Sequence, residues 1–177
     1  MATSSATDLF ETIVAEAAAE SPLWGEAVRA NSAREHVFGA LVPERFALGV
    51  ETIYEGYLLH YGRPRLFAPP DEDVALLLGD YLYAHGLVRI AATGDLAELI
   101  SLCAQSRAEG RAGEGEAWAA TCAVLGRGAL EDARAALRAE GEPGDGGAWI
   151  DCVRRLGGDL GRQAVERASA AHAERVG

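Results

Sequence analysis

The amino-acid sequence predicts an all-α protein, and three observations lead to that prediction. Apolar residues recur at helical spacing, as in the stripe formed by Phe46, Val50, Ile53 and Tyr57, and no stretch shows the alternation of a half-buried strand. Hydrophobic residues make up 49% of the 177 residues, whereas aromatic residues make up only 7%. The core is therefore expected to consist mainly of alanine, leucine and valine in a bundle of closely packed helices. At this length we expect one domain over residues 1–177, of which residues 1–6 form a flexible tail.

The helix expected over residues 73–92 is predicted to be the centre of this bundle. Its middle, from Val74 to Ile90, is apolar on nearly all sides, and a helix without a polar face is typical of a buried position. It is shorter than the roughly 20 apolar residues that a membrane span needs. Asp80 interrupts it, and a buried carboxylate needs hydrogen-bond donors. Asp80 is therefore predicted either to pair with a neighbouring helix or to face a cavity.

Capping signals predict four helices before the central one. Ser32 and Glu35 form a capping box, and prolines at the first positions of two other segments favour helix starts there. The four expected helices cover residues 8–20, 22–30, 33–41 and 43–60.

Glycine-rich breaks divide the second half of the chain into further helices. The segment 141–147 contains glycine and proline in most positions and is predicted to be an internal linker. The expected helices cover residues 95–109, 116–125, 130–140, 148–156 and 159–176.

Charge and composition exclude several classes of function. The formal net charge is −11, which argues against binding to nucleic acid or to anionic membranes. All 16 basic residues are arginines, so no mechanism can use a lysine amine. The three cysteines and four histidines show no spacing typical of a metal or redox site. The N-terminus lacks the pattern of a signal peptide, so a cytoplasmic location is expected.

Glu51 and Glu55 are the first candidate site residues. They are four positions apart on one expected helix and therefore share a face. Two carboxylates at that spacing can hold Mg²⁺ together with waters or phosphate oxygens. The alternative is a pair of solvated surface acids, and spacing alone leaves both interpretations open.

A longer pattern around these acids resembles the trans-polyprenyl diphosphate synthases. That family has an Asp-Asp-x-x-Asp motif shortly before Arg-Arg-Gly-x-Pro, and its next long helix often reads Leu-Leu-Gly-Asp-Tyr-Leu. Here Gly62-Arg63-Pro64 matches the Gly-x-Pro, and the run Leu77–Leu82 matches the helix. Counting back from Gly62 places the acidic motif on Glu51–Glu55. The resemblance covers about residues 43–108 and implies an isoprenoid-synthase-like bundle that dimerises.

The sequence departs from that family at the residues that carry catalysis. Glutamates replace two of the motif aspartates, Thr52 replaces the third, and no second Asp-rich motif follows. His60 and Tyr61 stand where the diphosphate-binding arginines would be, although Arg63 and Arg65 could partly replace them. The resemblance thus implies Glu51 and Glu55 as metal ligands. It implies a substrate-binding set of Glu51, Glu55, His60, Tyr61, Arg63, Arg65 and Asp80.

We therefore expect a shortened, non-catalytic relative without a cofactor. It would act as a subunit or binding partner in polyprenyl diphosphate metabolism, as a homodimer or as a heterodimer with a longer synthase-like chain, with an isoprenoid ligand. One alternative is a divergent Mg²⁺-dependent prenyltransferase or terpene synthase. The other is a helical interaction module with no small-molecule ligand.

Overall fold

The computed structural model describes residues 5–32, 34–91 and 166–176, together with the single positions 118, 122, 163 and 164. Within these residues the chain is helical and contains no strand, apart from an isolated bridge between Val28 and Phe67. The all-α prediction is confirmed for this part of the chain. The expected linker at 141–147 and the helices expected between residues 95 and 156 lie outside the described residues, except for Trp118 and Cys122. The named elements are α1 (Ser5–Glu20), α2 (Pro22–Glu26), the 3-10 helix η1 (Gly39–Leu41), α3 (Glu44–Tyr61) and α4 (Glu72–Ala91).

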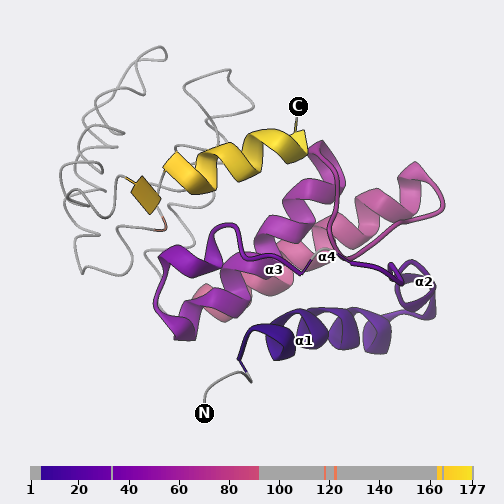
Figure 1. Ribbon diagram of the computed structural model, residues 1–177. Helices are drawn as coiled ribbons and strands as arrows, with labels where there is room; N and C mark the ends of the chain where they lie inside the picture. Colours follow the sequence, from indigo (N-terminus) through magenta and orange to yellow (C-terminus); the bar gives the residue numbers. More distant parts are fainter. Residues whose placement is uncertain are drawn as a thin grey trace, which may run out of the picture.

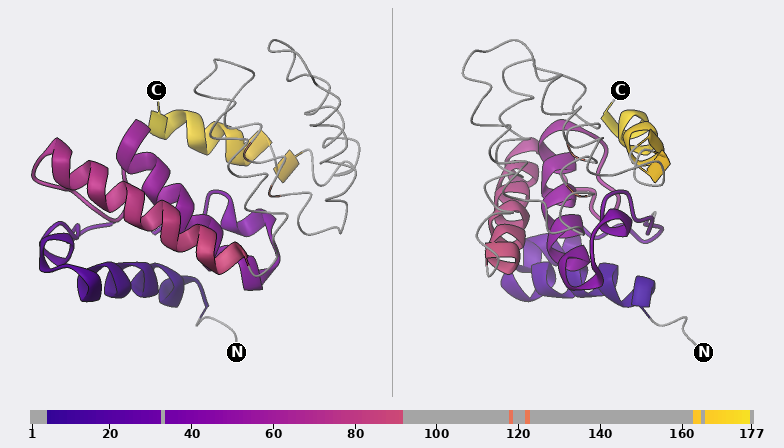
Figure 2. Two further views of the ribbon diagram at one scale, coloured as in Figure 1. Left: turned by 180° about the vertical axis from the view of Figure 1, so that it is seen from behind. Right: turned by 90° about the vertical axis from the view of Figure 1, so that its left-hand side faces the viewer.

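Helix α3 is the central helix of the described residues. Every residue from Gly49 to Leu59 is buried. Figure 2 shows α3 between α4 and the helix at residues 166–176, which we call the C-terminal helix, while α1 crosses beneath them. Local signals define the ends of α3. Pro43 precedes its first turn, and after its last turn the Gly62 N–H donates to the Leu58 carbonyl 2.9 Å away. The expected helix at 43–60 is thus confirmed to within a residue.

Four buried glycines allow α3 and α4 to pack very closely. A Cβ atom at Gly56 would lie 2.7 Å from the carbonyl oxygen of Gly79, and one at Gly86 would lie 2.8 Å from that of Gly49. On each helix the two glycines are seven residues apart, which is about two turns. The first glycine of α3 thus faces the second glycine of α4, and the second faces the first. This register follows from the antiparallel course of the two helices (Figure 1).

Helix α4 forms almost where it was expected, but it is not buried on all sides. Leu78 and Leu82 are buried against α3, whereas the exposed fractions of Leu77 and Val88 are 61% and 73%. The expectation of all-round burial is therefore wrong for one face. This exposed face of α4 consists of Asp73, Leu76, Leu77, Asp80, Ala84 and Val88.

The segment 33–41 is the clearest error of secondary-structure prediction. Only Gly39–Leu41 form a turn of 3-10 helix, and residues 34–38 are irregular. The Ser32–Glu35 capping signal competes there with a tertiary contact, because the backbone N–H groups from Val37 to Gly39 bind a glutamate of α3. Helix α1 begins at Ser5 rather than at residue 8, inside the expected tail. Helix α2 ends at Glu26, earlier than expected, because Ala27 and Arg29 pair with the backbone of residues 66–68.

No described helix has the length and apolar character that crossing a membrane would require.

Candidate functional site

Helix α3 places Glu51 and Glu55 on one face inside the protein, where both meet Arg65. The Nη1 atom of Arg65 lies 2.5 Å from Glu51 Oε2, and its Nε lies 3.0 Å from Glu55 Oε2. All three side chains are fully buried, with exposed fractions of 0%. We call these three residues the buried ion cluster. The sequence correctly placed the two acids on one face, but they are not surface acids.

The remaining oxygens of the two carboxylates bind backbone N–H groups. Glu51 Oε1 accepts hydrogen bonds from Val37, Phe38 and Gly39, at 3.1, 3.1 and 2.6 Å. Glu55 Oε1 accepts one from the N–H of Leu66 at 2.7 Å. The two acids therefore hold two separate loops against α3.

Arg65 is held as firmly as the acids are. Its Nη1 also donates to the carbonyl of Glu35 at 2.8 Å, and its guanidinium lies over the rings of Phe10 and Tyr54, 5.4 and 5.0 Å from their centroids. Burial alone would lower the pKa of Arg65, but Glu51 and Glu55 outweigh that effect and raise the pKa above its ordinary value. Arg65 therefore stays charged at every pH at which the protein is folded.

This geometry does not fit the magnesium ion that the family resemblance implies. Every oxygen of Glu51 and Glu55 already accepts at least one hydrogen bond, and Arg65 occupies the position between them. Mg²⁺ needs near-octahedral oxygen ligands at about 2.1 Å, so it would have to displace the guanidinium. Among the described residues no group of three or more His, Cys, Asp or Glu side chains is placed to hold a metal ion.

Asp80 and His60 form a second pair, in which His60 is half-buried and Asp80 is exposed. His60 Nε2 lies 3.2 Å from Asp80 Oδ1, and the Asp80 side chain is 69% exposed. Asp80 therefore does not face the interior space that Glu51 and Glu55 occupy. Tyr61 lies beside this pair, with its ring 5.6 Å from that of His60 and 53% of the residue exposed.

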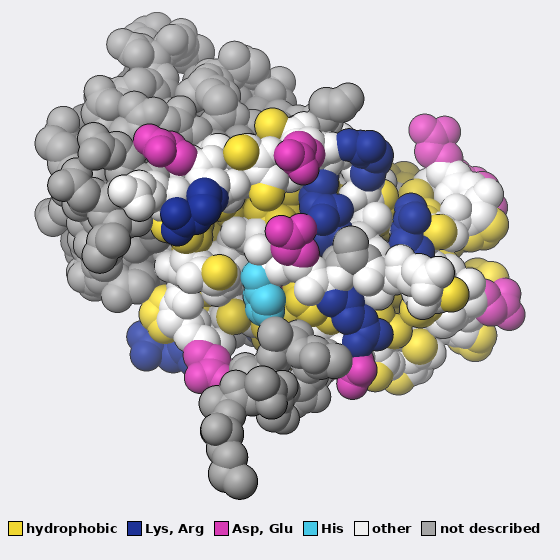
Figure 3. Space-filling model, viewed as in Figure 1, with side chains coloured by type: hydrophobic (Ala, Val, Ile, Leu, Met, Phe, Trp, Pro, Cys, Tyr) yellow, Lys and Arg dark blue, Asp and Glu magenta, His cyan; other side chains and the backbone are white. Residues whose placement is uncertain are grey.

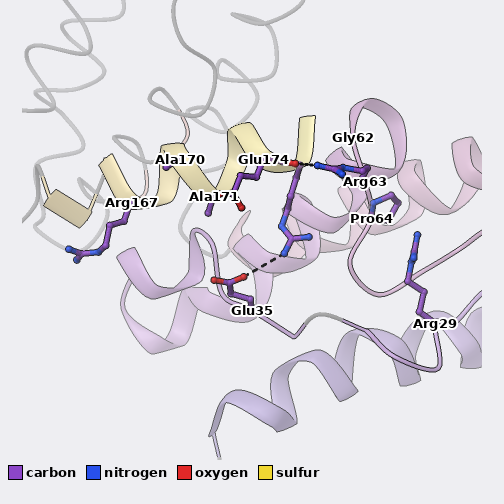
Figure 4. A pocket seen from close by; sticks show the side chains of 10 residues that line it. Arg29, Glu35, Gly62, Arg63, Pro64, Arg167, Ala170, Ala171 and Glu174 are labelled. Carbon is purple, nitrogen blue, oxygen red and sulfur yellow. Dashed lines mark hydrogen bonds and ion pairs between the residues drawn. The ribbon is translucent and has the colours of Figure 1, made fainter. Parts of the chain in front are cut away.

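Arg63 lies in a pocket that the sequence did not predict. The pocket has a volume of 680 Å³ and lies between the end of α3 and the C-terminal helix (Figure 4). Arg63 donates from its side chain to the carbonyl of Glu174 and from its backbone N–H to that of Arg175, the latter at 2.9 Å. On this face of the molecule arginine and acidic side chains are interspersed (Figure 3). The lining residues are Arg29, Glu35, Gly62, Arg63, Pro64, Arg167, Ala170, Ala171, Glu174 and Arg175.

Sequence reasoning also missed a buried polar contact between α3 and the C-terminal helix. The Tyr54 hydroxyl lies 3.0 Å from Nδ1 of His172. Burial raises the pKa of Tyr54 above its ordinary value, although Arg65 acts in the opposite direction. No sequence signal connects these residues, which are 118 positions apart. The contact joins the C-terminal helix to Tyr54, whose ring packs on the guanidinium of Arg65.

Comparisons with family models, with curated proteins and with solved structures find no match for this chain.

Proposed function

We propose that this chain is a non-catalytic helical-bundle protein of isoprenoid-synthase type that acts as a subunit or binding partner in polyprenyl diphosphate metabolism. The observation that carries the proposal is the position of Arg65 between Glu51 and Glu55. Prenyl transfer needs several metal ions to stabilise the departing diphosphate. The acid pair that the resemblance assigns to the metal is instead balanced by an arginine of the same chain.

This arrangement supports a structural role for residues that would otherwise be catalytic. The buried ion cluster connects α3 to residues 37–39 and to Leu66. Breaking a buried ion pair by removing one partner costs about 3–5 kcal/mol. A metal that replaced Arg65 would leave the guanidinium buried without its carboxylates, so metal binding would oppose folding.

The exposed face of α4 supports the proposed association with a second chain. Leu76, Leu77 and Val88 are each more than half exposed, and exposed apolar groups gathered on one helix face are typical of interaction sites. The partner under this proposal is a second copy of the chain or a longer synthase-like chain. The same face would equally serve a helical interaction module without a ligand, which is the second candidate function.

Release of inorganic diphosphate from an allylic diphosphate, measured with and without Mg²⁺, tests the non-catalytic proposal. We expect no release above background from the isolated chain. Melting curves should show no rise with Mg²⁺, because a ligand stabilises a protein only where it binds the folded state better. Mg²⁺-dependent release that Glu55→Gln abolishes, while a neutral control such as Arg45→Gln retains it, would instead identify a divergent prenyltransferase or terpene synthase.

Light scattering on a matched pair of variants tests the role of α4. We expect Leu77→Glu to shift the population toward monomer, or to abolish capture of a longer synthase-like chain. Leu23→Glu is the control, because Leu23 on α2 has nearly the same exposed fraction, 58% against 61%. The proposed interface would be contradicted if Leu77→Glu and Leu23→Glu changed the monomer population equally. It would also be contradicted if the unsubstituted protein were a monomer that captures no longer synthase-like chain. Capture that no isoprenoid diphosphate affects would favour the interaction module.

A further inference from the structure

An excess of positive charge is concentrated in the pocket between α3 and the C-terminal helix. Four arginines line it, Arg29, Arg63, Arg167 and Arg175, against two glutamates, an excess of two positive charges. The chain as a whole has a net charge of −11, so this concentration is opposite in sign to the rest of the protein. Charges of one sign that line a concave site attract counter-ions to it. We call this site the arginine pocket.

Within the described part of the chain, Arg29 and Arg167 of the arginine pocket keep donors that bind no acceptor. Arg29 uses its Nε atom to bind the carbonyl of Phe67 at 2.7 Å, and among the described residues its terminal nitrogens have no acceptor. Arg167 is exposed and has no ion-pair partner within the described part of the chain. Arg175 is only 18% exposed, and its contact with Glu35 at 3.7 Å is long for a charged hydrogen bond.

The backbone fixes the position of this pocket. Arg63 binds the C-terminal helix through both its side chain and its N–H, and a Cβ atom at Gly62 would lie 2.9 Å from the carbonyl of Arg175. The loop after α3 and the end of the C-terminal helix are thus in direct contact. In Figure 4, Arg29 and Arg167 lie toward opposite ends of the lining. A ligand between them would be contacted by residues from three separate segments of the chain.

We propose that the arginine pocket binds a small phosphate-bearing anion. A phosphate dianion matches the excess of two positive charges, and arginine forms paired hydrogen bonds with phosphate oxygens. A volume of 680 Å³ lies within the range of about 300–1,000 Å³ that is usual for small-molecule sites. An extended acidic peptide is disfavoured, because it would reach beyond the pocket along a chain whose net charge is −11.

The uncharged lining distinguishes this site from a site for a prenyl chain. Apart from the charged residues, only Gly62, Pro64, Ala170 and Ala171 line the pocket. These small groups offer little apolar area to a hydrocarbon tail. The inference does not rest on the proposed function, since it needs neither Mg²⁺ nor a relationship to the synthases.

Calorimetry with inorganic diphosphate tests the proposal, with sodium chloride of equal ionic strength as the reference. We expect binding without added metal and a higher melting temperature in diphosphate than in chloride. Arg29 and Arg167 lie toward opposite ends of the pocket, so at least one of Arg29→Gln and Arg167→Gln should weaken binding by about tenfold, the usual effect of losing a charged hydrogen bond. A loss in neither variant would contradict the proposal. Glu35→Gln should strengthen binding severalfold, because it removes the carboxylate that competes for Arg175. A purely structural role for these residues would not produce that gain.

Arg45→Gln is the matched control. It removes the same charge, but Arg45 lies in the first turn of α3 over the ring of Phe46, at the other end of that helix from Gly62 and Arg63, and it does not line the pocket. A loss in Arg45→Gln equal to that in Arg29→Gln and Arg167→Gln would overturn the proposal in favour of non-specific attraction. So would the absence of any difference between diphosphate and chloride, or preferential binding of an oligoglutamate peptide. Geranyl diphosphate should bind no more than a few times better than diphosphate, and a hundredfold preference would overturn the proposal in favour of a prenyl site.

Discussion

Helices α3 and α4 pack closely against each other, yet the more polar of the two is the more deeply buried. Helix α3 contains three glutamates, and two of them, Glu51 and Glu55, are fully buried. Helix α4 is apolar through most of its length, yet it leaves Leu76, Leu77 and Val88 on the surface. The polarity of these two helices therefore predicts the wrong order of burial.

The difference follows from what surrounds each helix. Around α3, Arg65 and the backbone N–H groups of residues 37–39 and 66 supply every donor that Glu51 and Glu55 need, so burial leaves none of their carboxylate oxygens unpaired. Around α4, α3 covers one side, and in the described part of the chain nothing covers the face that contains Leu77. A polar residue can be buried where its partners are fixed, and an apolar residue stays exposed where no neighbour is available.

Removing Arg65 should produce the largest loss of stability. Arg65→Leu leaves two buried carboxylates without their cation, and we expect the free energy of unfolding to fall by about 3–5 kcal/mol, measured by urea denaturation. Arg45→Leu, at an exposed site, should cost less than about 0.5 kcal/mol. Adding Glu55→Gln to Arg65→Leu should restore part of the loss. If the two arginine variants were equally stable, the buried ion cluster would not be what holds the loops to α3.

The close contact of α3 and α4 can be tested with two glycine variants. A Cβ atom at Gly56 would meet the backbone of α4, at 2.7 Å from Gly79 O and 2.9 Å from Tyr83 N. The helices must then separate, and we expect Gly56→Ala to destabilise the protein by about 1–3 kcal/mol in thermal unfolding.

Gly79→Ala is the matched control for this variant. The three atoms nearest to its Cβ atom would all belong to the ring of His60, a side chain that can move more easily than the backbone. Alanine also favours a helix over glycine by about 1 kcal/mol, so Gly79→Ala should be close to neutral. A Gly79→Ala variant as unstable as Gly56→Ala would show that the two contacts are equally rigid.

Alkaline pH should weaken the folded protein through Tyr54. Burial raises the pKa of Tyr54 in the folded state, whereas the unfolded chain has the ordinary value of 10.0. The unfolded state therefore loses this proton first. The stability that Tyr54 contributes is complete below pH 10 and is lost as the pH rises further.

The expected slope above pH 10 is about 1.4 kcal/mol per pH unit from this group. Tyr54→Phe should remove that slope, at a cost of about 1 kcal/mol at neutral pH from the lost contact with His172. Burial, together with Glu20 and Glu16, also raises the pKa of Tyr81. Tyr81 is partly exposed, so Tyr81→Phe should flatten the decline less. Urea denaturation between pH 8 and pH 11 measures both variants, and an unchanged slope in Tyr54→Phe would contradict the assignment.

The pair formed by His60 of α3 and Asp80 of α4 should give the smallest effect. Asp80 is 69% exposed beside His60, and exposed ion pairs contribute about 0–1 kcal/mol. We expect Asp80→Asn to change the free energy of unfolding at pH 6 by less than about 0.5 kcal/mol. A loss comparable to that of Arg65→Leu would mean that Asp80 has a buried partner, as the sequence had suggested.

The sequence by itself determined the helical character of the described residues and the bounds of α3 and α4. These features depend on short-range signals such as apolar spacing and a proline before the first turn. The same locality explains why Glu51 and Glu55 could be assigned to one face, since four residues make about one turn. It also explains the error at residues 33–41, where a local capping signal was weaker than the hydrogen bonds from Val37, Phe38 and Gly39 to Glu51.

Only the tertiary structure decided which helix is central, which cation balances the two acids, and where positive charge collects. Arg65 lies in a loop after α3, and nothing local indicates that this loop returns to the acids. The residues of the arginine pocket come from segments as far apart as Arg29 and Arg175, so no window of sequence contains them. Burial and charge pairing depend on which segments the fold brings together, and that information is distributed over the whole chain.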